Sequence, residues 1–137
     1  MNASRRKAWL VPVFLFGFAY FLIGRVFALP TDHVQVWRIA AWLVSSGAYA
    51  SHIWFEHFRL RNSSRLMAVH AAMAVAIGAF GLAVAGMIHS LSTASAIQPM
   101  WLLALVAWPA VTVIPAFLGA LAAGAMLRRF PRSADAE

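Results

Sequence analysis

The residues of this sequence that could do chemistry follow one another along a single apolar segment, on one face of an expected helix. Their separations of three, four and seven positions suit a helix that turns by about 100° per residue. The polar members of this stripe are Arg38, Ser45, Tyr49, His52 and Glu56. Polar and ionisable groups are costly in lipid, so we expect this face to look into a helix bundle or a wet cavity.

His70 is expected to join the inner end of this stripe. His52 precedes, and His70 follows, one short basic connection by about five residues each. Two antiparallel helices would therefore place both imidazoles at the same depth. Glu56 lies one helical turn after His52, where it could pair with a protonated ring. Side chains of these types transfer protons, form internal hydrogen bonds or ligate a metal centre.

Three functions are compatible with this inner group, and the sequence leaves them open. The leading interpretation is a non-catalytic accessory or scaffold subunit, in which the stripe only forms internal hydrogen bonds. The first alternative is a channel or transporter that moves protons or a solute along the polar stripe of residues 38–56. The second alternative is a membrane anchor that binds one b-type haem, with His52 and His70 as axial ligands.

Enzymatic activity is not expected. The sequence contains no zinc-protease helix motif, no nucleophile elbow and no phosphate-binding loop. His52, Glu56 and His57 match the spacing of metal ligands only loosely, so we expect no metal site apart from the haem alternative. The absence of cysteine excludes disulfides, thiolate metal sites and iron–sulfur clusters.

A second polar group is expected near the outer surface of the membrane. Arg25 and Arg38 flank one short connection and could together bind an anion or a lipid phosphate. Alternatively both arginines extend outward into the headgroup region, and Asp32 neutralises one of them. The full outer group consists of Arg25, Asp32, His33, Arg38 and His89.

Four long apolar segments must position these residues. Hydrophobic residues make up 63% of the chain and charged residues 11%, against roughly 25% charged residues in an average soluble domain. Each segment has 22 residues or more, enough to cross about 30 Å of hydrocarbon as a helix. The first is longer than a usual signal-peptide core, so we expect it to be retained as a span. The expected spans are residues 8–29, 34–55, 66–88 and 100–127.

The basic residues predict the orientation of these spans. Nine of the eleven lysines and arginines lie before the first segment, between the second and third, and after the last. Both termini and the middle connection should therefore be cytoplasmic, in the inner (plasma) membrane. The formal net charge of +7 suits anionic lipid headgroups on the cytoplasmic side and not nucleic acid. The three clusters are Arg5, Arg6 and Lys7; Arg59, Arg61 and Arg65; and Arg128, Arg129 and Arg132.

Short connections predict an all-α fold, an integral membrane four-helix bundle in up-down-up-down order, as one domain of residues 1–137. Small residues in the third and fourth segments would let helix backbones approach closely. That approach serves packing within the chain, or alternatively a homo-oligomer or a larger membrane complex. The glycines expected at these helix contacts are Gly78, Gly81, Gly119 and Gly124.

Overall fold

The computed structural model describes residues 9–94 and 99–129. In this part of the chain the secondary structure is entirely helical, which confirms the predicted all-α class. The basic residues Arg5, Arg6, Lys7 and Arg132 lie outside the described residues. The helices are α2 (Leu10–Val26), α3 (Val34–Trp54), the short π-helix η1 (Phe55–Arg59), α4 (Ser64–Ala94) and α5 (Pro99–Leu127).

The four α-helices differ from the expected spans in length. Helices α4 and α5 are long and apolar enough to cross a membrane, whereas α2 is apolar but has only 17 residues. At about 1.5 Å per residue, α2 is roughly 26 Å long. It ends at Val26 instead of Leu29 because a proline disfavours helical geometry in the residue before it, and Pro30 follows Leu29.

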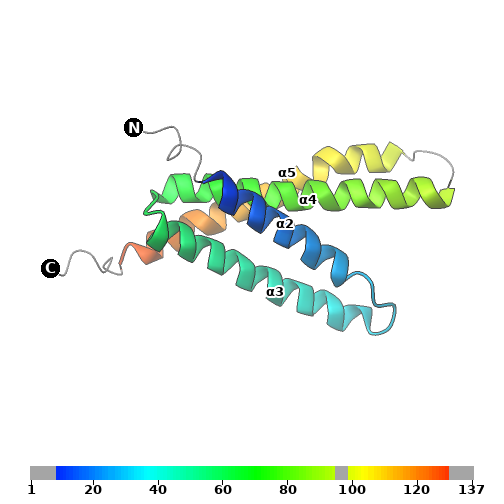
Figure 1. Ribbon diagram of the computed structural model, residues 1–137, viewed down its shortest axis with the longest axis horizontal. Helices are drawn as coiled ribbons and strands as arrows, with labels where there is room; N and C mark the ends of the chain where they lie inside the picture. Colours follow the sequence, from blue (N-terminus) through cyan, green and yellow to red (C-terminus); the bar gives the residue numbers. More distant parts are fainter. Residues whose placement is uncertain (1–8, 95–98, 130–137) are drawn as a thin grey trace.

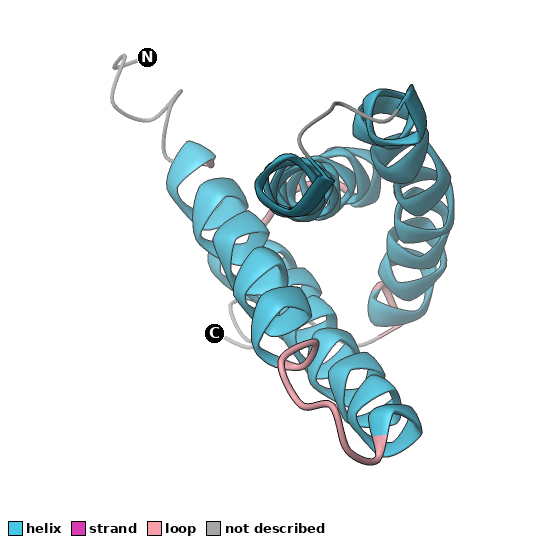
Figure 2. Cartoon of the chain, turned by 90° about the vertical axis from the view of Figure 1, so that its right-hand side faces the viewer, coloured by secondary structure: helices cyan, strands magenta, loops and turns pink. Residues whose placement is uncertain are grey.

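Helix α4 occupies the centre of the arrangement. It packs chiefly against α5 and α2, whereas α3 contacts α2 and touches α4 and α5 at few places. Figure 1 shows α4 and α5 side by side, α2 crossing them, and α3 diverging from α4 towards one end. In Figure 2 α4 is seen nearly end-on, with the α2–α3 hairpin on one side and α5 on the other.

Glycines let α2 and α4 approach closely at their crossing. A Cβ atom added at Gly78 would lie 2.6 Å from Cβ of Tyr20 and 3.0 Å from the carbonyl oxygen of Gly17. A Cβ atom at Gly81 would lie 3.0 Å from the ring of Phe21. Because these glycines have no side chain, the two helix backbones touch directly, as expected for helices that associate through small residues.

The contact between α4 and α5 uses the same principle. A Cβ atom at Gly124 would lie 2.8 Å from Met67 and from Ser64 of α4. Met67 is fully buried and contributes the largest apolar side chain of the core in the described residues. This core consists of Ile53, Met67, Ala68, Ala71 and Ala120.

Two prolines interrupt the hydrogen-bond ladder of α5, and the helix continues through both. Pro109 and Pro115 have no N–H to donate, so the carbonyl groups one turn earlier lose their usual partner. Between them the Thr112 hydroxyl lies 3.0 Å from the carbonyl oxygens of both Trp108 and Pro109. This side chain donates to the backbone of the preceding turn, a contact that often bends a helix. The carbonyls that the two prolines leave without a partner are different ones, those of Leu105 and Val111.

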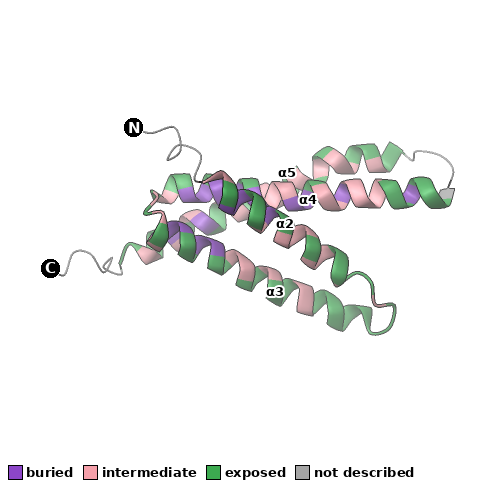
Figure 3. Ribbon diagram, in the orientation of Figure 1, coloured by how far each residue is buried: buried purple, intermediate pink, exposed green. Residues whose placement is uncertain are grey.

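Burial is concentrated at one end of the structure. Figure 3 shows buried residues gathered where α3 passes into η1 and α4 begins, and along α4 itself. In contrast, Val36, Trp42 and Leu43 in the first half of α3 are between 62% and 79% exposed. Helix α3 therefore packs against the other helices at the η1 end, which we call the closed end, and stands apart from α4 and α5 at the other, the open end.

Candidate functional site

The candidate site lies at the closed end, where the π-helix η1 extends α3. A π-helix carries an extra residue per turn, and such turns occur frequently at functional sites. The backbone N–H of Leu60 donates to the carbonyl of Phe55, five residues earlier, at 3.2 Å. Both Glu56 and His57, which are consecutive, are buried in this turn. The sequence alone did not indicate this widening.

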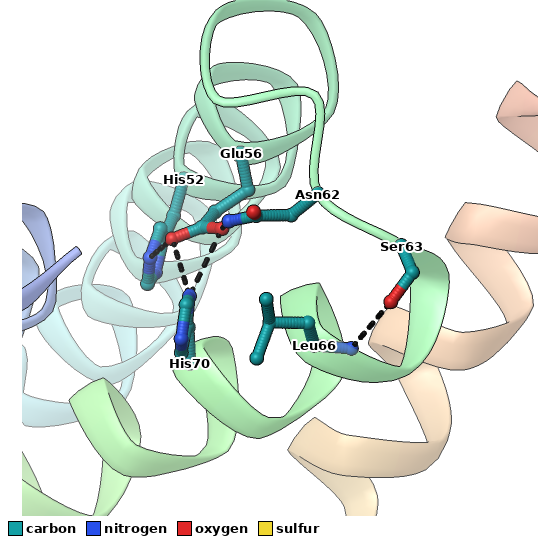
Figure 4. A network of polar contacts seen from close by, with 6 residues as sticks. All are labelled: His52, Glu56, Asn62, Ser63, Leu66 and His70. Carbon is teal, nitrogen blue, oxygen red and sulfur yellow. Dashed lines mark hydrogen bonds and ion pairs between the residues drawn. The ribbon is translucent and has the colours of Figure 1, made fainter. Parts of the chain in front are cut away.

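The Glu56 carboxylate is the centre of the site. Its side chain is fully buried, and Nδ1 of His70 lies 3.0 Å from Oε1 and 3.1 Å from Oε2. An ionised carboxylate only accepts hydrogen bonds, so the hydrogen of this contact is carried by Nδ1 of His70. Figure 4 shows His70 on α4 pointing at the carboxylate from one side and His52 approaching from α3.

Asn62 closes the site from the connection between η1 and α4. Its side-chain amide donates to Oε2 of Glu56, and its backbone N–H donates to the Glu56 carbonyl at 3.2 Å. The preceding residue, Arg61, has a left-handed backbone with φ of 52°. This conformation is uncommon for a residue with a side chain, and it reverses the chain so that Asn62 faces Glu56.

His52 has no hydrogen bond although it is fully buried. Its Nε2 atom lies 3.7 Å from Oε1 of Glu56, and neither ring nitrogen has a hydrogen-bond partner. The ring stacks on Phe16 of α2, with centroids 4.3 Å apart and planes within 7°. A buried polar group without a partner is rare in proteins and calls for an explanation.

Helix α2 covers the cluster with aromatic rings. Trp9 stacks on His70 with centroids 4.8 Å apart, in the same manner as Phe16 stacks on His52. The two histidines therefore each have one ring face against an aromatic side chain and an edge near Glu56. These contacts exclude water from a group of titratable side chains, which strengthens their mutual electrostatic interaction.

Two opposing effects act on the pKa of Glu56. Burial alone raises the pKa of this carboxyl, because the charged form loses its hydration. The contacts with His52, Asn62 and His70 favour the charged form and outweigh burial, so the pKa lies below its ordinary value. Glu56 is therefore held as a carboxylate at neutral pH.

The structure gathers only the inner part of the expected stripe. His52, Glu56 and His70 meet, and the Tyr49 hydroxyl donates to the carbonyl of Ala116 on α5. Ser45 is half-buried beside a crevice between the helices, and Arg38 is exposed. The five residues expected to form an outer group are all exposed, and no ion pair joins any two of them: Arg25, Asp32, His33, Arg38 and His89.

Sequence reasoning missed three members of the cluster. Asn62 is a single polar residue in a short connection, and no periodicity indicates where its side chain points. Trp9 and Phe16 are two of several aromatic residues in the first apolar segment, and composition alone does not distinguish them. Their separation of seven residues places both on one face of α2, which is the signal that could have paired them with two histidines.

The arrangement suits hydrogen bonding and proton exchange more than ligation of a metal ion. In the described residues, no group of three His, Asp or Glu side chains is placed to hold one metal ion. One oxygen of Glu56 lies near a ring nitrogen of each histidine, 3.0 Å from His70 and 3.7 Å from His52. Comparison of the chain with models of protein families, with curated proteins and with solved structures gives no match.

Proposed function

We propose that this chain is a four-span protein of the inner membrane that acts as a non-catalytic accessory or scaffold subunit. In this proposal α2 and α3 cross the membrane together with the two longer helices, and both termini are cytoplasmic. A larger membrane complex, or a homo-oligomer, is the assembly to which such a subunit would belong.

The distribution of charge supports the placement. Arg59 and Arg65 flank the start of α4, and Arg128 follows the end of α5. Figure 1 shows that the start of α4 and the end of α5 lie at the same end of the structure. Basic residues collected at one end favour the cytoplasmic side, where they meet anionic lipid headgroups.

The single observation that carries the accessory proposal is the internal use of Glu56. Its carboxylate is fully buried and receives hydrogen bonds from Asn62 and His70, so it connects η1, the following turn and α4. A carboxylate with this many internal partners acts as a structural link between helices. Among the described residues, the histidines and the glutamate of this site are all buried: His52, Glu56, His57 and His70.

Cysteine labelling tests the placement. The chain contains no cysteine, so Ser63→Cys and Ser92→Cys each introduce a single thiol at opposite ends of α4. We expect a membrane-impermeant maleimide added to intact cells to label position 92 and not position 63. Labelling of both positions from outside would refute the four-span orientation.

A second candidate function, proton transfer across the membrane, is favoured by His52. Its ring nitrogens have no hydrogen-bond partner, although Nε2 is 3.7 Å from a buried carboxylate. A movement of about 1 Å would create a direct hydrogen bond between the two groups. Titratable side chains that can make and break such contacts within a span are typical of proton relays.

Reconstituted vesicles distinguish the two functions. Purified protein is incorporated into vesicles that contain a pH-sensitive dye, and a pH gradient is imposed. If the protein is an accessory subunit, vesicles that contain it should have the same proton permeability as vesicles without protein. Flux above that level, abolished by Glu56→Gln and retained in Asp32→Asn, would replace it with the proton-transfer function.

Haem binding by His52 and His70 receives less support from this geometry. Both rings direct a nitrogen towards the same oxygen of Glu56, so the carboxylate lies where an iron between the two rings would have to bind. The absorption spectrum of the purified protein tests this alternative, because a b-type haem gives a strong Soret band. Such a band, lost in both His52→Ala and His70→Ala, would establish the haem-anchor function.

A further inference from the structure

A crevice lies between the four helices, at a distance from the Glu56 cluster. Its volume is about 480 Å³, within the range of roughly 300–1,000 Å³ typical of small-molecule sites. All four α-helices contribute side chains to its lining, and none of these side chains carries a charge. The polar side chains that line it are two indoles and five hydroxyl residues: Trp42, Trp108, Tyr20, Ser45, Ser46, Tyr49 and Thr112.

The Tyr20 hydroxyl is the feature of this crevice that the protein itself does not explain. It is buried and has no hydrogen-bond partner. Three of the other hydroxyls differ: Tyr49 donates to the Ala116 carbonyl, Ser46 donates to the Trp42 carbonyl at 2.8 Å, and Thr112 donates to the backbone of the preceding turn. A buried donor without an acceptor is unfavourable, so an acceptor supplied by a ligand would stabilise this part of the structure.

We propose that the crevice binds a neutral, membrane-soluble amphiphile that carries a carbonyl group on an apolar body. The carbonyl accepts a hydrogen bond from Tyr20, and the apolar body lies against Trp42, Trp108 and Leu82. The absence of charge in the lining excludes an ionic head, because an unpaired ion in an apolar crevice is strongly disfavoured. Two kinds of molecule offer this chemistry: a quinone, and an ester lipid such as a diacylglycerol.

The divergence of α3 from α4 and α5 gives such a ligand a way in. Trp42 is 79% exposed at the edge of the crevice, and the first half of α3 stands apart from α4 and α5. An amphiphile dissolved in the bilayer would therefore enter sideways, between α3 and α5. This inference rests on the membrane placement proposed above.

Protection of an introduced thiol tests the site. Ala41→Cys places a thiol in the lining of the crevice, and Ala110→Cys places one on an exposed position of α5 outside it. The probes are decylubiquinone and dioleoylglycerol, each added to the purified protein before alkylation with N-ethylmaleimide. A seated ligand buries about 70–90% of its surface, so one probe should slow alkylation at position 41 by roughly three- to tenfold. The rate at position 110 should not change.

The hydrogen bond from Tyr20 is tested in the Ala41→Cys background. Tyr20→Phe removes the hydroxyl and keeps the ring, and it should raise the concentration of probe needed for protection by about two- to tenfold. Ser51→Ala is the control, because it removes a hydroxyl of α3 that lies outside the crevice and donates to the Gly47 carbonyl. It should leave that concentration unchanged.

The possible outcomes test the ligand and the membrane placement separately. Protection by decylubiquinone alone identifies a quinone site, and protection by dioleoylglycerol alone identifies a lipid ester site. Equal alkylation with and without either probe overturns the proposal. In sealed vesicles, slow reaction of the thiol at position 110 with a water-soluble maleimide confirms that α5 lies in the membrane. Fast reaction there would refute the membrane placement independently of the ligand.

Discussion

The Nδ1 atom of His70 lies within 3.1 Å of both carboxylate oxygens of Glu56, so a single buried contact joins α4 to the π-helix that ends α3. The two residues are 14 positions apart in the chain. Their contact therefore fixes the position of the first turns of α4 relative to the end of α3. Because both side chains are buried, loss of either one leaves the other without its partner in a site with little water.

We expect Glu56→Ala to lower the free energy of unfolding by about 2–4 kcal/mol, since His70 and Asn62 both lose a buried acceptor. Thermal unfolding of the purified protein in detergent measures this change. Asp32→Ala removes an exposed carboxylate and serves as control, with an expected change below about 0.5 kcal/mol. A double-mutant cycle with His70→Ala should show strong coupling. Additive effects would mean that the two side chains do not touch.

Two histidine substitutions of the same kind should have different effects. His52→Phe keeps the stacking on Phe16 and removes two ring nitrogens that have no hydrogen-bond partner, but it also removes a group that favours the Glu56 carboxylate. The free energy of unfolding should therefore change by less than about 1 kcal/mol. His70→Phe removes the donor to Glu56 and should lower it by about 1–3 kcal/mol. Melting temperatures of the two variants test this difference. Equal destabilisation by both would show that His52 has a hydrogen-bond partner in the folded protein.

Glycine substitutions should reveal where helix backbones touch. Gly78→Ala forces a Cβ atom to 3.0 Å from the Gly17 carbonyl oxygen, and it should cost about 1–3 kcal/mol. Gly47→Ala is the matched control, because no atom lies within 4 Å of a Cβ atom there. Alanine has the higher helix propensity, so this variant should be neutral or more stable by up to about 1 kcal/mol. If Gly78→Ala is equally harmless, the crossing of α2 and α4 is looser than described.

The low pKa of Glu56 predicts a pH dependence of stability. Between the folded and unfolded pKa values, the unfolded chain binds more protons, so stability rises with pH. The stabilisation is present above the unfolded pKa and is lost as the pH falls through the folded value. The difference in melting temperature between the protein and Glu56→Gln should therefore shrink towards acid. A difference that grows towards acid would contradict the assignment of His52, Asn62 and His70 as groups that favour the carboxylate.

Local patterns in the sequence predicted the helices, although α4 runs to Ala94, past the expected limit at residue 88, and the π-helix was not expected. Apolar length and short connections predicted four helical segments, and the second and fourth end within a residue of the expected limits. The first is shorter because Pro30 acts on the residue before it. The fourth continues through Pro109 and Pro115, although each removes one backbone hydrogen bond. These are effects of neighbouring residues, which a sequence carries directly.

The composition of the cluster was only partly accessible from the sequence. Equal distance from one connection placed His52 and His70 at the same depth, and helical spacing suggested His52 as the partner of Glu56. The structure places His70 closer, at 3.0 Å against 3.7 Å for His52. The reason is the π-helix, which turns Glu56 towards α4, together with the turn at Arg61 that brings in Asn62.

The sequence by itself determined the helical class, the grouping of basic residues and the candidate polar side chains, because each depends on composition and on spacing along one segment. Only the tertiary structure decided that α3 diverges from α4, that an uncharged crevice opens between the helices, and that Tyr20 and His52 are buried without hydrogen-bond partners. These features depend on how closely helix backbones approach at Gly17 and Gly78 and on which side chains hold them apart elsewhere. Such distances arise from packing between segments far apart in the chain, and no pattern within one segment specifies them.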